Sequence, residues 1–377
     1  VYLLAARLSL ALTIDPQGVA PLWLPSGIML AWVLLEPGRW RIWPGIWIGA
    51  FCATAWAQLE TGSTTTPTLA NLAAATRASG EVLAALVAAR LMAPARQVRE
   101  LIGSSLGFTR LAAYGAVLGP ALSATTGVGA LLLGATLDWQ DWPYRWLDWW
   151  AAGSVGVLLI TPAALALGLK ERRASRLPDR RGMVLIALVV VALAALSLAA
   201  PPLDLPLHVP LLVMVPFLVW ASFSFDQRAS YSMVLAVSAL AIIVTAAGKG
   251  PFMDGPASET VLELQFFLAA LAVSIYFLGT AVAERQGYQR SLAESMERFR
   301  RLFEDSAVGT VVMAPDGRYL QANAAFCRLL GYSREQILER KASDLTYPGD
   351  AHERSESVRQ LLQGQIDHLA LEKRYLH

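Results

Sequence analysis

Two ionisable side chains lie inside an apolar stretch at residues 69–91, where a charge is costly. Arg77 and Glu81 stand four positions apart near its middle, and Asn71 lies closer to its start. On a helix, residues four apart share a face, so Arg77 and Glu81 can form an ion pair. Ionisable residues at membrane depth are candidates for function. We therefore interpret the cluster either as a buried ion pair that fixes helix packing or as a polar site for a small ligand.

A second candidate region, residues 138–150, combines carboxylates with tryptophans. Asp138, Asp141 and Asp148 alternate there with five tryptophans. Tryptophan gathers at membrane–water interfaces, so the simple interpretation is an aromatic belt. The carboxylates also make the region a candidate outward-facing lip of a ligand site, with Asp148 and Trp149 as contacts. Three hydroxyl residues of the apolar run at 109–133 could line the same cavity as Arg77 and Glu81, although bonding back to their own helix is the simpler explanation: Ser123, Thr125 and Thr126.

The sequence contains no recognisable catalytic set. Gly248 and Lys249 lack the earlier glycine of a phosphate-binding loop, and His352 lacks the second histidine of a metal site. GGDEF, EAL and kinase phosphoacceptor motifs are also missing from these residues. The net charge of +2 gives no overall nucleic-acid footprint. We expect no catalytic residue, no metal site and no nucleic-acid partner in this chain.

Composition divides the chain near residue 283 into a membrane part and a soluble part. Hydrophobic residues make up 55% of the chain and charged residues 16%, whereas soluble domains are about a quarter charged. Of the 60 charged side chains, 28 lie in residues 284–377. Ten apolar runs before the boundary approach the length that a bilayer core of ~30 Å requires: 1–14, 20–36, 42–58, 69–91, 109–133, 149–169, 183–200, 207–224, 230–247 and 261–283.

Basic residues in the loops between these runs predict the orientation. If the N-terminus is cytoplasmic, the loops on that side hold 13 Lys and Arg, while the outer loops hold only Arg145 and Lys249. Cytoplasmic loops of membrane proteins are enriched in basic residues. The sequence therefore predicts an all-α polytopic bundle of about ten transmembrane helices in the lipid bilayer, with both termini in the cytoplasm.

Four segments of the membrane part share small residues and prolines at characteristic places. They are Leu-Trp-Leu-Pro-Ser-Gly at 22–27, Trp-Pro-Gly-Ile-Trp-Ile-Gly-Ala at 43–50, the Gly-Pro segment at 119–127 and the Trp-Trp segment at 149–162. Gly45 with Gly49, and Gly115 with Gly119, form small-xxx-small pairs, which let membrane helices approach closely.

In this order the segments resemble the MASE-type membrane-associated sensor domains, the first of the MASE families. The resemblance covers roughly residues 1–285, and we place the domain at 1–283. Such domains precede PAS, GGDEF/EAL or histidine-kinase domains in bacteria. The resemblance implies a sensory role in a bacterial inner membrane; it does not identify the small-molecule or protein stimulus.

Residues 284–304 are expected to form a charged helix that continues from the last span. Its apolar residues recur at spacings of four and three. That stripe suits a seam between two chains, or one face that packs on the next domain. We predict a homodimer in which the stripe relays the signal, with four candidate relay residues: Tyr288, Leu292, Met296 and Phe299.

Residues 305–377 are predicted to form a small cytoplasmic α+β domain. We expect a strand at 308–313, a turn at 315–318, a second strand at 319–321, helices opened by Asn323, Ser333 and Asp350, a helix end at Gly364 and a last strand at 369–375. The order of seven residues closely resembles a PAS domain: Gly309, Asp316, Gly317, Asn323, Gly331, Tyr332 and Asp350. No residues of this sequence correspond to the last two strands of that fold, so we expect a truncated domain with an effector beyond it.

The expected function is that of a sensory input module. It would relay a small ligand or a membrane or periplasmic cue through the helix and the PAS domain to a cyclic-di-GMP synthase or phosphodiesterase. Two alternatives stay open: the input region of a sensor histidine kinase, and a secondary transporter with a regulatory tail. We expect no cofactor, because Cys327 lacks the sequence context of flavin-photoreactive domains. His352 leaves haem as an alternative.

Overall fold

The computed structural model describes residues 1–14, 20–36, 42–60, 67–92, 98–133, 137–168, 216, 219–220, 222–223, 227–249, 252–253, 257–350 and 355–377. These residues form two compact units, Val1–Gln286 and Gly287–His377. Each unit is described by itself.

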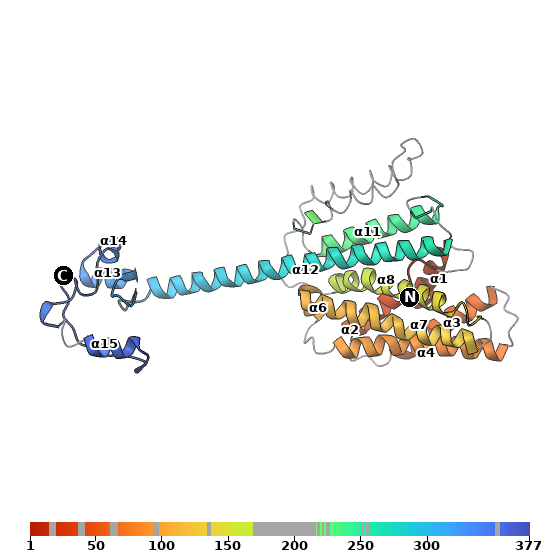
Figure 1. Cartoon of the computed structure of the whole chain (residues 1–377), viewed down its shortest axis with the longest axis horizontal. Helices are drawn as coiled ribbons and strands as arrows, with labels where there is room; N and C mark the ends of the chain where they lie inside the picture. Colours follow the sequence, from red (N-terminus) through yellow and green to blue (C-terminus); the bar gives the residue numbers. More distant parts are fainter. Residues whose placement is uncertain are drawn as a thin grey trace, which may run out of the picture. The chain divides into compact units, whose positions relative to one another are not determined.

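The described part of the first unit consists of helices joined by turns (Figure 1). Its helices are α1 (Tyr2–Ala11), α2 (Leu24–Leu35), α3 (Ile42–Glu60), α4 (Pro67–Met92), α5 (Val98–Gly103), α6 (Ser105–Arg110), the π-helix η1 (Leu111–Leu118), α7 (Gly119–Leu133), α8 (Trp142–Gly168), α11 (Gln227–Ala246) and α12 (Ala257–Glu304).

Four of these described helical stretches are long and apolar enough to cross a membrane, so the protein is a multi-pass membrane protein. They are Pro67–Met92, Ser105–Leu132, Trp142–Gly168 and Glu259–Glu304, and shorter apolar helices accompany them at Tyr2–Ala11, Leu24–Leu35 and Ser230–Ala246. The predicted span at 183–200 lies outside the described residues, and so does most of the predicted span at 207–224.

Helices α2 and α8 pack backbone against backbone at two glycines. A Cβ atom on Gly156 would lie 2.1 Å from the carbonyl oxygen of Trp23, and one on Gly27 would lie 2.2 Å from the carbonyl oxygen of Gly156. The Thr161 hydroxyl donates across this contact to the Gly27 carbonyl at 3.0 Å. The closest backbone approach therefore occurs here. Of the predicted small-residue pairs, Gly49 and Gly115 also have close neighbours, since a Cβ atom on them would lie 3.0 Å from Tyr2 and from Leu30, whereas a Cβ atom on Gly45 would meet nothing within 4 Å.

The helix that begins at Ser105 and ends at Leu133 is interrupted by a wide turn in its middle. At the end of η1 the Gly119 amide bonds to the Tyr114 carbonyl, five residues back, and Pro120 brings no amide hydrogen for the carbonyl of Ala116. The Ser154 hydroxyl of α8 bonds to this Ala116 carbonyl at 2.6 Å, and the Trp150 indole of α8 bonds to the neighbouring Val117 carbonyl at 3.0 Å. Wide turns of this kind recur at functional sites.

Helix α12 is continuous from the last apolar run through residues 284–304. The predicted helical extension of the last span is therefore confirmed. In its membrane part, Tyr276 is fully buried and packs edge-on against Phe108 of α6 and Tyr231 of α11, at ring-centroid distances of 6.0 and 4.7 Å.

The second unit contains a two-stranded antiparallel sheet of β1 (Val311–Met313) and β2 (Tyr319–Ala322). Gly317, in the turn between them, has φ +84°, which a glycine adopts without strain. The hydrophobic core of the unit lies under β2 and the following helices: Tyr319, Ala322, Phe326, Leu330, Ile337 and Leu345.

Its helices begin and end largely where the sequence predicts. Helix α13 (Ala324–Leu330) starts with Asn323 as its N-cap and ends at Gly331 with φ +76°. The capping box of Ser333 and Gln336 opens α14 (Arg334–Leu338). Helix α15 (Ser355–Leu362) ends shortly before Gly364, which has φ +69°.

Two predicted elements of this unit, a strand at 369–375 and a helix from Asp350, are not found as expected among the described residues. The strand expected at 369–375 is wrong: that segment runs extended beside residues 345–347 and forms only an isolated bridge between Thr346 and Tyr375. The helix expected to open at Asp350 falls partly outside the described residues, because 351–354 are not described; Asp350 itself ends the short 3-10 helix η2 (Pro348–Asp350).

Candidate functional site

Glu81 is the centre of a buried polar cluster that joins three helices. Its side chain is 5% exposed on α4. One carboxylate oxygen accepts a hydrogen bond from the Trp23 indole at 2.9 Å, and the other accepts one from the Tyr2 hydroxyl. Trp23 directly precedes α2 and Tyr2 opens α1. A buried carboxylate therefore holds α1, α2 and α4 together through neutral donors.

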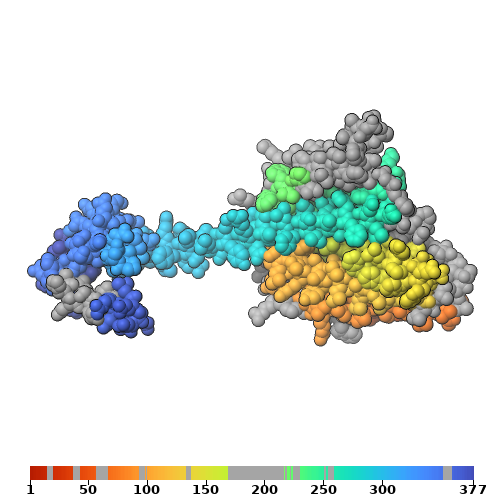
Figure 2. Space-filling view, in the orientation of Figure 1, coloured from red at the N-terminus to blue at the C-terminus, as the bar shows by residue number. Residues whose placement is uncertain are grey.

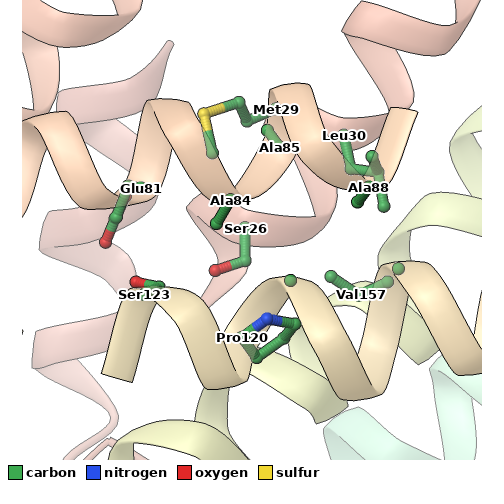
Figure 3. Close-up of a pocket in the computed structure, with 12 residues that line it drawn as sticks. Ser26, Met29, Leu30, Glu81, Ala84, Ala85, Ala88, Pro120, Ser123 and Val157 are labelled. Carbon is green, nitrogen blue, oxygen red and sulfur yellow. The ribbon is translucent and has the colours of Figure 1, made fainter. Parts of the chain in front are cut away.

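A small cavity adjoins this carboxylate, between α2, α4, α8 and the helix of Ser105–Leu133. Its volume is about 20 Å³, which is room for about one water molecule. The close-up in Figure 3 shows the Glu81 carboxylate and the hydroxyls of Ser26 and Ser123 turned toward the same space. Pro120, at the wide turn, forms part of the wall.

The hydroxyl residues of α7 divide into two groups. Thr125 and Thr126 bond back to carbonyls of their own helix, at 2.8 Å to Ala121 and 3.1 Å to Leu122, as predicted. Ser123 is 8% exposed and lines the cavity instead. Of the three hydroxyl residues, Ser123 is therefore the one whose side chain lies at the same cavity as Glu81.

Arg77 lies one turn from Glu81 but takes a different partner. Its guanidinium carbon sits 5.5 Å from the centre of the Trp149 ring, a cation–π contact between α4 and α8. Its Nε atom is buried without a hydrogen-bond partner among the described residues. The ion pair expected between Arg77 and Glu81 does not form within the described residues, because the two side chains reach different neighbouring helices.

The other predicted site residues lie at different distances from this cluster. Trp149 closes on Gly127, where a Cβ atom would meet the ring at 2.8 Å, so α7 and α8 are in close contact here. Asp148 is half-buried on α8 next to Trp149, while Asn71 is exposed on α4. The structure thus brings Arg77, Glu81 and Trp149 into one region and leaves Asn71 on the surface of the bundle.

Tyr2, Trp23 and Ser26 belong to the site and were missed from the sequence. Trp23 and Ser26 stand in the Leu-Trp-Leu-Pro-Ser-Gly segment, so the segment itself was a signal. Nothing in the sequence around Tyr2 indicates that its hydroxyl would reach a carboxylate 79 positions away.

The aromatic region at 138–150 forms paired stacks. The Trp139 and Trp142 rings stack with centroids 6.1 Å apart, and those of Trp146 and Trp150 stack at 6.2 Å. The Trp146 indole also donates to the Thr125 hydroxyl at 3.0 Å. Helix α8 begins at Trp142, so most of the predicted lip is the first two turns of a helix.

The predicted relay residues all lie on the exposed part of α12. Tyr288, Leu292, Met296 and Phe299 are 56–70% exposed. The Phe299 ring stacks on Phe303 at 5.9 Å, so the stripe is continuous to the end of the helix.

The PAS motif residues hold backbone and turns in place. The fully buried Asn323 makes four hydrogen bonds: its oxygen accepts from the amides of Thr310 and Phe326, and its nitrogen donates to the carbonyls of Phe303 and Val308, all at 2.8–2.9 Å. A Cβ atom on Gly309 would lie 3.1 Å from the Phe326 backbone. These contacts tie the end of α12 to the sheet and to α13.

Three further motif residues make charged or cation–π contacts at the surface. Hydrogen bonds from Arg318 hold the pKa of Asp316 below its ordinary value. Asp350 pairs with Arg374 at 2.8 Å. The Tyr332 ring lies 4.8 Å from the guanidinium of Arg340. Among the described residues of both units, no group of three His, Cys, Asp or Glu is placed to hold a metal ion.

Comparison with known proteins agrees with this architecture. Residues 1–286 match the MASE1 family and residues 297–375 match the PAS fold. The probable diguanylate cyclase DgcE of Escherichia coli K12 is 26% identical over 361 residues, covering 95% of this chain and 31% of the relative. The C4-dicarboxylate transport sensor protein DctS of Rhodobacter capsulatus is 32% identical over 235 residues, covering 56% of this chain and 34% of the relative.

The chain thus spans about a third of the length of each of these two relatives. A shorter match, 30% identical over 86 residues, joins 23% of this chain to 9% of the sensor histidine kinase TmoS of Ectopseudomonas mendocina. No solved structure matches the chain. With its match over residues 1–286, followed by a PAS domain, the chain belongs to the MASE1 family of membrane sensors.

Proposed function

We propose that this chain is the input part of a cyclic-di-GMP synthase, and that the cluster around Glu81 is its sensing site. The observation that carries the proposal is α12: one uninterrupted helix joins the MASE1 span to the PAS domain, so a change in the bundle has a covalent route outward. A match to a probable diguanylate cyclase over 95% of the chain supports the choice of effector.

The sensing site is proposed because its two ionisable side chains, Arg77 and Glu81, are buried without pairing with each other. Among the described residues, the Arg77 guanidinium lies over the Trp149 ring and its buried Nε has no hydrogen-bond partner, while Glu81 accepts hydrogen bonds from neutral donors. Charges at membrane depth are costly unless they serve packing or function. The cavity at Glu81 has room for about one water molecule, so a larger ligand would have to open the bundle.

The test uses the full-length protein in native membranes and measures cyclic di-GMP formation. Glu81→Gln and Arg77→Gln are expected to change the basal output, because each alters a contact between helices. Glu263→Gln is the matched control, since Glu263 is an exposed glutamate on α12, and it should leave the output unchanged. Equal output from all four proteins would contradict the site.

A sensor histidine kinase is the second candidate effector, supported by the matches to two sensor proteins. Autophosphorylation of the full-length protein on histidine, with no cyclic di-GMP formed, would replace the first proposal by this one. Neither result fits a secondary transporter.

We also propose ten spans with both termini in the cytoplasm of a bacterial inner membrane. The loop charges support this topology, since 13 basic residues fall on one side. Reporter fusions after Arg41, Arg176 and Arg228 should all report cytoplasm, and a periplasmic signal at any of them would overturn it.

A parallel homodimer with its seam along α12 completes the proposal. The stripe from Tyr288 to Phe299 is exposed in the single chain, and coiled coils bury such stripes. Cysteines at 288, 292 and 296 should crosslink between chains in membranes more readily than cysteines at 290 and 294. Uniform crosslinking at all five positions would exclude this seam. The PAS domain is proposed to work without a cofactor.

A further inference from the structure

One helix touches both the Glu81 cavity and the output helix α12. The helix from Ser105 to Leu133 lines the cavity with Gly119, Pro120 and Ser123 in its middle. At its start it packs on α12, as Figures 1 and 2 show for the two helices side by side. Between the two contacts lies the wide turn of η1.

The start of this helix is bonded to a carboxylate of α12. One oxygen of Glu284 accepts hydrogen bonds from the Ser105 amide at 3.2 Å and from the Ser105 hydroxyl at 2.9 Å. Ser104, the N-cap, uses its own hydroxyl for the Gly107 amide at 3.0 Å. A carboxylate at a helix N-terminus also meets the positive end of the helix dipole. Glu284 therefore adds a second, inter-helix cap to the helix start.

Glu284 stands where α12 leaves the bundle. Its side chain is half-buried, and the described side chains from Arg285 to Met296 are all exposed. The first compact unit ends at Gln286. Glu284 thus makes the contact nearest to the exposed stripe, while Tyr276, eight residues earlier, makes the apolar one.

The helix can adopt two backbone conformations at the wide turn, one with the π turn and one with regular α-helix. A π turn contains one residue more than an α turn. If that residue were absorbed into regular α-helix, the segments before and after it would rotate relative to each other by about 100°. Ser105 would then turn away from Glu284. The donors from Ser154 and Trp150 to the carbonyls of η1 favour the wide form.

We propose that Glu284 is the output latch of the membrane bundle, and that the π turn of η1 is the element that opens it. A change at the cavity acts on Ser123 and Pro120, shifts the turn toward regular α-helix, and breaks the contact between Ser105 and Glu284. The last turns of the membrane part of α12 are then released. The proposal names the regulation of the proposed sensing site, and so it rests on the proposed function for its physiological input.

The test measures one distance inside the first unit of the intact chain. Spin labels are placed on cysteines at Leu106 and Gln286, two exposed positions beside the latch, after Cys52 and Cys327 are changed to serine. Pulsed electron resonance in nanodiscs should give one narrow distance distribution for the parent. Glu284→Ala should broaden this distribution and shift it to longer distances, because both acceptor contacts to Ser105 are lost.

Three more variants make the result decisive. Glu294→Ala, an exposed glutamate on the same helix, should leave the parent distribution unchanged. Ser105→Ala keeps the backbone hydrogen bond to Glu284 and should give a smaller change in the distance distribution than Glu284→Ala. If the Glu284→Ala protein does not fold, Ser105→Ala takes its place as the test. Ser154→Ala lies far from both labels along the chain and should shift the distribution in the same direction as Glu284→Ala.

Each outcome decides a part of the proposal. An unchanged distribution in Glu284→Ala and Ser105→Ala overturns the latch. If the distance distribution changes in Glu284→Ala and Ser105→Ala but not in Ser154→Ala, the proposed role of the π turn is overturned. The measurement needs neither ligand nor effector, so a failure of the proposed sensing site would not produce either result.

Discussion

Replacing Asn323 by alanine should loosen the joint between α12 and the PAS domain. The Asn323 amide is fully buried and makes four hydrogen bonds, two as acceptor and two as donor. A single hydrogen bond contributes roughly 0.5–1.5 kcal/mol, and buried groups left unpaired cost more. Since some of the freed backbone groups can bind water instead, we expect a loss of about 3 kcal/mol, mostly within residues 303–326.

Hydrogen exchange of the intact chain in nanodiscs measures this loss where it occurs. A loss of about 3 kcal/mol corresponds to roughly hundredfold faster exchange through local opening. Peptides that cover β1, β2 and α13 should show it, whereas peptides from α4 and α8 should not. Gln321→Ala is the matched control, because Gln321 is an exposed amide on β2 and should change the rate little. Unchanged exchange in Asn323→Ala would refute the reasoning.

Two further predictions concern packing and charge. Gly156→Ala should destabilise the bundle by at least about 2 kcal/mol in thermal melting, because the new Cβ atom would lie 2.1 Å from the Trp23 carbonyl oxygen; Gly279→Ala, with nothing within 4 Å, should be neutral or gain up to about 1 kcal/mol. Asp350→Ala should remove the paired hydrogen bonds to Arg374 and speed exchange near residues 345–376 severalfold, a modest effect because the Arg374 side chain is exposed. Similar melting of the two glycine variants, or no change in exchange for Asp350→Ala, would contradict them.

Local signals in the sequence were sufficient wherever a structure depends on near neighbours. The N-cap Asn323, the C-terminal Gly331 and the Ser333–Gln336 capping box act within one or two turns, and all were predicted. Apolar runs also predicted most helices, because lipid requires each span to satisfy its own backbone hydrogen bonds. The strand at 369–375 failed because the segment's β-rich composition does not decide whether it finds a partner along its whole length.

The polar cluster could be located but not resolved from the sequence. The spacing of Arg77 and Glu81 places them on one face of α4, and that much is correct. Their partners, Trp149, Tyr2 and Trp23, come from other helices and depend on tertiary packing that no local rule contains. The wide turn was equally hidden, since Pro120 marks a break in a helix without saying which side chain will satisfy the freed carbonyl.

The central proposal is that the membrane bundle acts on the proposed cyclic-di-GMP synthase through α12, whose stripe from Tyr288 to Phe299 forms the proposed seam between two chains. Insertions between Gly287 and Tyr288 in the full-length protein test it directly, with cyclic di-GMP formation in membranes as the readout. Two inserted residues rotate the stripe by about 200° relative to the bundle, whereas seven restore its direction to within about 20°. The account predicts that output is lost or locked with two inserted residues and regained with seven. Output that falls steadily with insertion length, or that ignores it, would contradict the account.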